Sequence, residues 1–135
     1  MDRLIRTHGA RRLVLVVEDN EINREIAVAL LTDASFIVDT AENGQVALGM
    51  LTAAPAGAYD AVLMDIQMPV MDGVTASKAI RALADPALSS IPIVAMTANV
   101  FGEDLERERE AGMTAHISKP LHVEQMLGTL AEVLG

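Results

Sequence analysis

The chain has 135 residues, of which 51% are hydrophobic and 2% aromatic, and its formal net charge is −9. This length suits one domain with one core, and so high an apolar content argues against disorder. The sequence contains no cysteine, which excludes disulfides and thiolate metal sites. Residues 1–12 carry a net charge of +3 and residues 13–135 carry −12. Nucleic-acid binding is disfavoured for so acidic a body, because neutralising phosphates requires clustered Lys and Arg.

The basic segment 1–12 precedes an apolar run of five residues, Leu13–Val17. That run is too short for the apolar region of a signal peptide and far too short for a membrane-spanning helix. We interpret residues 1–12 as a linker or an expression remnant. We expect residues 13–135 to form a soluble, cytoplasmic domain without membrane contact of its own, even if its parent protein is a membrane-bound sensor.

Short apolar runs and amphipathic stretches alternate along the rest of the chain. Asn20 is a plausible N-cap for the first helix, Asn43-Gly44 is a turn signal before the second, and Gly112 a C-cap after the fourth. In chain order the pattern predicts a strand at Leu13–Val17, a helix at Glu21–Thr32, a strand at Phe36–Thr40, a helix at Gln45–Ala53, a strand at Ala61–Met64, a helix at Gly73–Ala84, a strand at Ile93–Met96, a helix at Gly102–Ala111, a strand at Ala115–Ser118 and a helix at Val123–Leu134.

Five strands that alternate with five helices predict an α/β fold, a doubly wound (βα)5 domain of the flavodoxin-like type. The strands are continuous apolar runs, as expected for an all-parallel sheet that helices cover on both faces. The sequence does not fix the strand order, and 2-1-3-4-5 is the usual order for five strands. There is no repeat or internal linker that would divide the chain.

Polar side chains follow four of the predicted strands. Glu18 and Asp19 follow the first, Asp65 the third, Thr97 the fourth and Lys119 the fifth. Each of these residues alone has an ordinary interpretation, such as a solvated loop acid or an exposed cation. In a parallel sheet, however, all the carboxyl ends lie on one edge, where ligands bind at the reversal of strand order. We therefore predict that these side chains converge in one cleft.

Three carboxylates in one cleft require a compensating charge. At about 5 Å and an effective dielectric near 20, each pair repels by about 3 kcal/mol. Oxygen ligands without His or Cys favour Mg²⁺. An ionised carboxylate can also accept a phosphoryl group as a nucleophile, with Mg²⁺ and Lys119 neutralising charge and the Thr97 hydroxyl bonding a phosphoryl oxygen. A cis bond between Lys119 and Pro120 would aim the ammonium into the cleft, although cis bonds are the rarer form before proline.

The chain resembles a response-regulator receiver domain over nearly all of residues 13–134. The resemblance rests on four strings: Val-Val-Glu-Asp-Asn-Glu-Ile-Asn-Arg (16–24), Leu-Met-Asp-Ile-Gln-Met-Pro-Val-Met-Asp-Gly (63–73), Ala-Met-Thr-Ala-Asn (95–99) and Ile-Ser-Lys-Pro (117–120). The first two are most similar to receivers of hybrid sensor histidine kinases and their phosphorelays. The resemblance implies that Asp65 is the phosphoacceptor and that Thr97 and Lys119 contact the phosphoryl group.

The same resemblance implies a set of Mg²⁺ ligands. Asp19 and Asp65 would bind the ion directly, Glu18 through water, and Gln67 through its backbone carbonyl. The phosphodonor would be the phosphohistidine of a histidine kinase or of a histidine phosphotransfer domain. We expect such a four-helix phosphotransfer domain to dock on Ile22 and neighbouring exposed residues of the first helix.

One residue departs from the family pattern. Three positions before Lys119 the family usually has Tyr or Phe, the ring that moves inward with Thr97, and this chain has His116. Either the imidazole fills the aromatic position and keeps a switch that depends on pH, or the coupling to the fourth strand is altered. The charged stretch Glu103–Glu110 is interpreted as a solvated helix face with ion pairs, or as part of a surface for a partner.

The leading hypothesis is a phosphoacceptor module that assists its own phosphorylation and slow hydrolysis and is not a turnover enzyme. An aspartyl phosphohydrolase is the first alternative, but it typically needs an acid two residues beyond the nucleophile, where this chain has Gln67. A second alternative is a flavodoxin-like cofactor binder, but no phosphate-binding loop follows the first strand of this chain. A third is a receiver that binds partners without phosphorylation, against which the presence of the acids, Thr97 and Lys119 argues. The sequence leaves open whether the domain is a stand-alone regulator or, as we favour, a piece of a hybrid kinase.

Overall fold

The five strands form one parallel sheet, as predicted. The computed structural model describes residues 12–134 except residues 56, 67, 69 and 98–102. The strand order is β2-β1-β3-β4-β5, and all four strand pairs are parallel. The strands are β1 (Leu13–Val17), β2 (Ile37–Ala41), β3 (Ala61–Asp65), β4 (Ile93–Thr97) and β5 (Ala115–Ser118).

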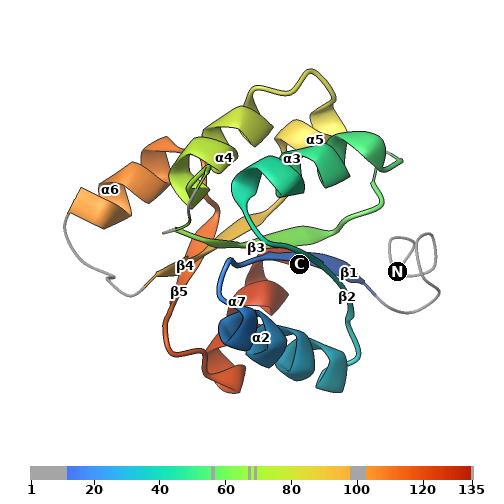
Figure 1. The fold of residues 1–135 in the computed structure, drawn as a ribbon, viewed down its shortest axis with the longest axis vertical. Helices are drawn as coiled ribbons and strands as arrows, with labels where there is room; N and C mark the ends of the chain where they lie inside the picture. The colour runs from blue at the N-terminus through green and yellow to red at the C-terminus, as the bar shows by residue number, and fades with distance from the viewer. Residues whose placement is uncertain (1–11, 56, 67, 69, 98–102, 135) are drawn as a thin grey trace.

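Helices cover both faces of this sheet (Figure 1). The helices are α2 (Glu21–Asp33), α3 (Gly44–Ala53), α4 (Gly73–Arg81), α5 (Pro86–Ser89), α6 (Glu103–Glu110) and α7 (Val123–Leu134). In Figure 1, α2 and α7 lie below the sheet and α3, α4 and α5 above it. None of the helices within the described residues is long and apolar enough to cross a membrane.

Two hydrophobic cores form because successive side chains of a strand point to opposite faces. From β1, Val14 and Val16 pack into the core under α2 and α7, where Leu31 and Leu130 are fully buried. Leu15, the residue between them, packs into the core under α3 and α4. The strands β1, β3 and β4 are buried throughout, whereas the edge strands β2 and β5 are only partly so. The continuous apolar runs in the sequence thus belong to the centre of the sheet.

Polar caps set the starts of the helices that follow β1, β2 and β3. The side chains of Asn20, Asn43 and Asp72 accept hydrogen bonds from backbone N–H groups in the first turns of α2, α3 and α4. Each bond satisfies a donor that the helix itself leaves unpaired. The cap predicted at Asn20 is therefore confirmed. Because these caps stand just after the strand ends, they also fix the loops from which the candidate site is built.

The element boundaries differ from the prediction in a few places. The third predicted helix, Gly73–Ala84, ends at Arg81 and is followed by the short helix α5, which was not predicted. Strands β3 and β4 extend one residue further than expected, to Asp65 and Thr97, and β2 is shifted by one residue. Residue 102 of the predicted fourth helix lies outside the described residues, as do residues 1–11 of the predicted linker. Arg12, the last residue of the predicted linker, makes a hydrogen bond to the folded domain, because its guanidinium donates to the Leu134 carbonyl.

Candidate functional site

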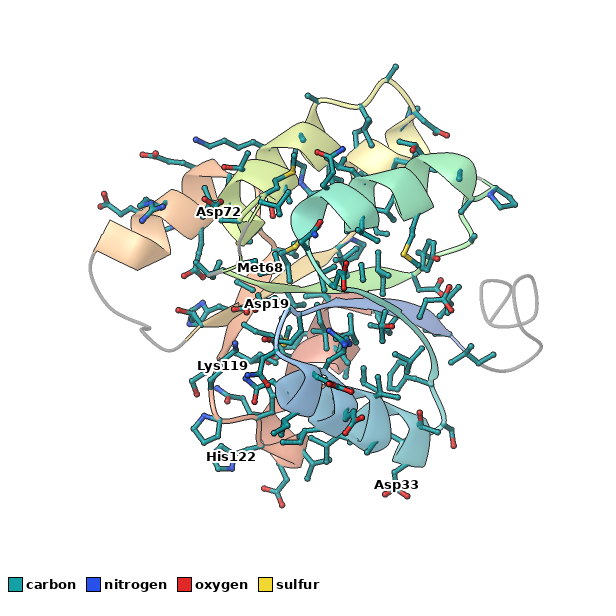
Figure 2. All side chains as sticks on the ribbon, viewed as in Figure 1. Asp19, Asp33, Met68, Asp72, Lys119 and His122 are labelled. Atoms are coloured by element: carbon teal, nitrogen blue, oxygen red, sulfur yellow. The ribbon has the colours of Figure 1, made fainter. Side chains whose placement is uncertain are left out.

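Four of the residues that the sequence analysis singled out lie at the carboxyl edge of the sheet. Asp65 ends β3, Thr97 ends β4, and Glu18 and Lys119 directly follow β1 and β5. In Figure 2, Asp19 and Lys119 lie at this edge, while Asp33 at the other end of α2 lies far from it. The parallel register keeps the strand ends level, since Asp65 pairs with Met96 in the neighbouring strand.

The three acids come together as predicted. Glu18, Asp19 and Asp65 each offer a carboxylate oxygen within 4.8 Å of the others. Glu18 is 2% exposed and Asp65 4%, whereas Asp19 faces solvent. Two buried carboxylates and one exposed carboxylate therefore form a pocket of negative charge that solvent can reach from one side.

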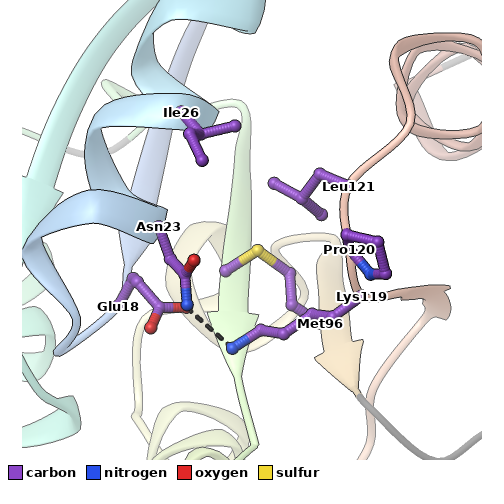
Figure 3. Close-up of a pocket in the computed structure, with 7 residues that line it drawn as sticks. All are labelled: Glu18, Asn23, Ile26, Met96, Lys119, Pro120 and Leu121. Atoms are coloured by element: carbon purple, nitrogen blue, oxygen red, sulfur yellow. Dashed lines mark ion pairs between the residues drawn. The ribbon is translucent and has the colours of Figure 1, made fainter.

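Lys119 is the cation within this acidic cluster. Its Nζ lies 3.0 Å from Glu18 Oε2 and 3.0 Å from Asp65 Oδ1, and Figure 3 shows the pair with Glu18. Burial alone would lower the pKa of Lys119, but hydrogen bonds to Asp65 and Glu18 outweigh it and raise the pKa. The ammonium therefore stays charged at neutral pH.

The pKa of Glu18 shifts upward despite the ion pair. Burial of the carboxylate is the largest cause, and the neighbouring charge of Asp65 adds to it, while Lys119 acts in the opposite direction. One ammonium does not fully compensate three acids. The cluster therefore favours the approach of a further cation.

Backbone contacts hold Glu18 in place. Its N–H donates to the Ala41 carbonyl of β2 at 3.0 Å, and its Oε1 accepts from the Asn20 N–H at 3.2 Å. Arg24, one turn into α2, donates from Nη1 to the Glu18 carbonyl at 2.9 Å. Arg24 was not predicted as a site residue, and only its place in the string 16–24 could have pointed to it.

Lys119 is fixed by the backbone of the neighbouring strand. Its N–H donates to the Thr97 carbonyl at 2.9 Å, and the Lys119–Pro120 peptide bond is cis. Thr97 itself is 4% exposed. The predicted juxtaposition of Thr97 and Lys119 at one edge is therefore present in the structure.

A cavity of about 360 Å³, which the sequence analysis did not anticipate, adjoins the acidic cluster. In Figure 3, Ile26 of α2 and Leu121 face each other across it, and Met96 lies beneath. Its full lining consists of Glu18, Asn23, Ile26, Met96, Lys119, Pro120 and Leu121. An apolar hollow thus opens beside the charged groups, between α2 and the turn that follows β5.

His116 lies apart from the acidic cluster. It is in β5, paired with Ala95, and its side chain is exposed. It lines a second cavity, of about 440 Å³, together with Arg109 of α6 and Thr129 and Glu132 of α7. Its predicted role as a switch stays a prediction. Gln67, whose carbonyl was predicted as a metal ligand, lies outside the described residues.

The donor set fits Mg²⁺. All three acids present oxygen, they lie close enough to share one ion, and one of them is open to solvent. A hard divalent ion that retains waters needs only a few carboxylates of this kind. The geometry also allows the Asp65 carboxylate to act as a nucleophile, because the Lys119 ammonium lies beside it.

The fold and the acidic edge together define a class: doubly wound α/β domains in which a carboxylate cluster and a lysine occupy the topological switch point. Within that class, the chain belongs to the response regulator receiver domain family, whose model matches residues 14–131. It is a receiver domain of two-component signalling.

Two relatives of known family illustrate the relationship. The chain is 44% identical to the two-component response regulator ORR41 of Oryza sativa subsp. japonica over 121 residues, which cover 88% of this chain and 91% of that protein. It is 36% identical to the hybrid signal transduction histidine kinase M of Dictyostelium discoideum over 122 residues, which are 90% of this chain but only 5% of that kinase. Some relatives are thus about as long as this chain, and others are many times longer.

Among solved structures, the chain is similar to the receiver domain of sensor histidine kinase PA1611 from Pseudomonas aeruginosa PAO1. The TM-score is 0.83 at 32% identity, with 93% of this chain and 99% of that chain covered. That structure has a magnesium ion coordinated in its active-site cleft. The resemblance stated from the sequence is therefore confirmed at the level of family and fold.

Proposed function

We propose that Asp65 accepts a phosphoryl group from a phosphohistidine, with Lys119 and Thr97 contacting that group. The observation that carries this proposal is the position of Lys119, whose Nζ lies 3.0 Å from both Asp65 Oδ1 and Glu18 Oε2. A buried carboxylate beside a fixed ammonium can act as a nucleophile toward an anionic group, because the cation offsets the charge repulsion.

In the transfer step, a carboxylate oxygen of Asp65 forms a bond to phosphorus. The bond between phosphorus and the donor's imidazole nitrogen breaks, and its electron pair stays on that nitrogen. Lys119 neutralises charge on the transferring oxygens, and the Thr97 hydroxyl donates a hydrogen bond to one of them. No general base is needed, since the carboxylate is already ionised.

We further propose that Glu18, Asp19 and Asp65 hold Mg²⁺, with Glu18 acting through water and the Gln67 carbonyl completing the set. The clustering of the three acids supports this proposal. When bound, Mg²⁺ supplies positive charge and orientation to the phosphoryl oxygens. In its absence Lys119 is the cation that keeps the cluster together.

The domain acts as a phosphoacceptor rather than a turnover enzyme. Hydrolysis of the acyl phosphate requires activation of water, and the position two residues beyond Asp65, where an aspartyl phosphohydrolase has its acid, is Gln67. The domain therefore assists its own phosphorylation and loses the group slowly.

The partners are a histidine kinase, a histidine phosphotransfer domain, or both, in the cytoplasm, and neither nucleic acid nor membrane is a ligand. The exposed isoleucines of α2 support the docking of such a protein on this helix, since Ile22 is 69% exposed and Ile26 45%. Both residues belong to the helix that forms one wall of the cavity beside Lys119. The domain is either part of a hybrid kinase, as we favour, or a stand-alone regulator, and in both cases signalling passes through Thr97 and His116 to the surface.

The acceptor assignment can be tested with acetyl phosphate and Mg²⁺, followed by intact-mass measurement. We expect one phosphoryl group on the wild type and none on Asp65→Asn. Asp72→Asn is a matched control, because Asn also caps a helix and this acid lies at the start of α4. The control should be labelled like the wild type. Labelling of Asp65→Asn at the wild-type rate would exclude Asp65 as the acceptor.

A further inference from the structure

The junction between β2 and α3, residues 41–44, contacts both sides of the acidic cluster. On one side, the Ala41 carbonyl accepts the Glu18 N–H at 3.0 Å. On the other, the Gly44 N–H donates to the Met71 carbonyl at 3.2 Å, in the loop between β3 and α4. This junction has no residue in the proposed chemistry, yet its backbone bridges the end of β1 and the loop after Asp65.

The loop between β3 and α4 directly follows Asp65, and at its other end Gly73 returns to the backbone of Asp65. The Gly73 N–H donates to the Ile66 carbonyl at 3.0 Å. A Cβ built on Gly73 would overlap the Asp65 carbonyl oxygen, so the two backbones are in direct contact. Because Met71 lies two residues before Gly73, a displacement of Met71 is passed to the backbone of Asp65 over a very short path.

Gly44 fits this place only because it lacks a side chain. A Cβ at Gly44 would lie 2.8 Å from the Met71 carbonyl oxygen and 2.7 Å from the Ala76 Cβ of α4. Both distances are shorter than carbon atoms tolerate, and the carbonyl cannot rotate away as a flexible side chain could. Gly44 is the first residue of α3, and Asn43 caps that helix through the Val46 N–H. The helix start is therefore itself held in position.

We propose that Gly44 is a positioning residue for the phosphoacceptor site: its missing side chain lets α3 rest on the Met71 carbonyl and so sets the loop that directly follows Asp65 and contacts its backbone through Gly73. This inference rests on the proposed function, since it concerns Mg²⁺ binding at the same acids. Gly44 touches neither the ion nor the phosphoryl group. It acts through Met71 and Gly73.

A purely structural role for Gly44 makes a different prediction. If Gly44 served only to pack α3 against α4, the contact with Ala76 would be the one that matters, and shortening Ala76 would repair the damage. If Gly44 positions the loop, the contact with the Met71 carbonyl matters, and a change at Ala76 cannot repair it. The two contacts can thus be separated by a second substitution.

The experiment compares the wild type with Gly44→Ala, Gly44→Ala/Ala76→Gly and the control Gly49→Ala. Gly49 is in the same helix, and a Cβ there would meet nothing within 4 Å. Binding of Mg²⁺ alone is measured by calorimetric titration, Tm is measured in EDTA, and the rate of labelling by acetyl phosphate is recorded. We expect Gly44→Ala to weaken Mg²⁺ binding about tenfold, the lower end of the range for residues that support metal ligands. Its labelling should slow in parallel, while Gly49→Ala keeps the wild-type affinity.

The double variant decides between positioning and packing. We expect its Mg²⁺ affinity to stay weak whatever its Tm in EDTA, because Ala76→Gly removes the contact between the two side chains but leaves the contact with the Met71 carbonyl. If Gly44→Ala does not fold, the double variant, which has more room, carries the test alone. Wild-type affinity in Gly44→Ala or in the double variant would overturn this inference and leave the proposed function intact. Absence of Mg²⁺ binding in the wild type and in Gly49→Ala would overturn both.

Discussion

The Lys119 ammonium lies 3.0 Å from a carboxylate oxygen of Asp65 and at the same distance from Glu18. These groups come from the ends of three different strands, and the loop after β5 supplies the only positive charge among them within the described residues. The cation therefore has two tasks. It stabilises a cluster of acids that would otherwise repel one another, and in the proposed reaction it faces the incoming phosphoryl group.

Replacing Lys119 by Met should test the first task, since Met has a similar length and no charge. In EDTA we expect unfolding to become easier by about 1–2 kcal/mol, between the values for an exposed and a buried ion pair. In millimolar Mg²⁺ the difference should shrink, because the ion neutralises the same acids and binds only the folded state. Urea unfolding in both buffers measures this. An equal loss of stability in EDTA and in Mg²⁺ would contradict the idea that lysine and metal share this role.

The Val70 backbone is strained, with a φ of +68°, and its side chain is 83% exposed. The left-handed conformation costs a β-branched residue about 1–2 kcal/mol, and at this position the side chain recovers little by packing. Val70→Gly should therefore stabilise the domain by about 1 kcal/mol, after allowing for the greater freedom of glycine in the unfolded chain. Thermal unfolding in EDTA is the measurement.

Val46→Gly is the matched control for Val70→Gly. Val46 is also an exposed valine, but it lies in the first turn of α3, where glycine is less favourable than valine by up to about 0.5 kcal/mol. The two substitutions should consequently shift Tm in opposite directions. A lower Tm for Val70→Gly would show that this valine has a packing role that outweighs its backbone strain.

The candidate site could be anticipated because it depends on strand ends. Glu18, Asp65 and Thr97 each follow an apolar run, and a parallel sheet brings such positions to one edge whatever the strands contain. The strand order was the usual one for five strands rather than a deduction, and it proved correct. The convergence of distant residues was predictable because topology, and not side-chain detail, produces it.

The end of the third helix and the cavity beside Lys119 were not predicted correctly from the sequence. Ala82, Leu83 and Ala84 are good helix formers, so local propensity extended the third helix to Ala84. The structure ends it at Arg81 and starts α5 at Pro86, with Asp85 as the cap. A continuous helix would bring the proline ring against the carbonyl four residues earlier, at Ala82. The cavity beside Lys119 likewise depends on how α2 approaches the turn after β5.

Arg81 itself joins three segments, and this gives a further prediction. Its Nε donates to the Gly112 carbonyl at 2.8 Å, and its Nη1 donates to the Ser89 and Ile91 carbonyls at 3.0 and 2.7 Å. Arg81→Met leaves these acceptors without their partner and should cost about 2–4 kcal/mol. Arg81→Lys should recover only part of this loss, because one ammonium cannot reproduce the planar fork.

Urea unfolding of the Arg81 variants provides the measurement, with Lys78→Met as the control. Lys78 is exposed on the same helix, and its substitution should change stability by less than about 0.5 kcal/mol. Full recovery by Arg81→Lys would indicate that charge alone, rather than the three directed hydrogen bonds, is what the position requires.

Tyr59 allows a pH prediction with a direct spectroscopic readout, because it is the only tyrosine in the chain. Its hydroxyl donates to Asp39 Oδ2 at 2.7 Å. Burial is the largest cause of a strong upward shift in the pKa of Tyr59, and the hydrogen bond to Asp39 and the charge of that carboxylate add to it. In the unfolded chain the pKa returns to its usual value of about 10.

The folded state thus holds the phenolic proton more tightly than the unfolded state does. Its contribution to stability is fully present below about pH 10 and is lost as the pH rises through the folded pKa.

Tyrosinate absorbance of the native domain should therefore appear only at a pH above the midpoint measured in urea. Asp39→Asn should move the native midpoint back toward that of the unfolded chain, since it removes the negative charge that opposes ionisation. Tyr59→Phe should unfold more easily than the wild type by about 1–2 kcal/mol at pH 8, and by less at pH 10.5. Equal midpoints for the native and the unfolded chain would show that the hydrogen bond to Asp39 does not hold the proton.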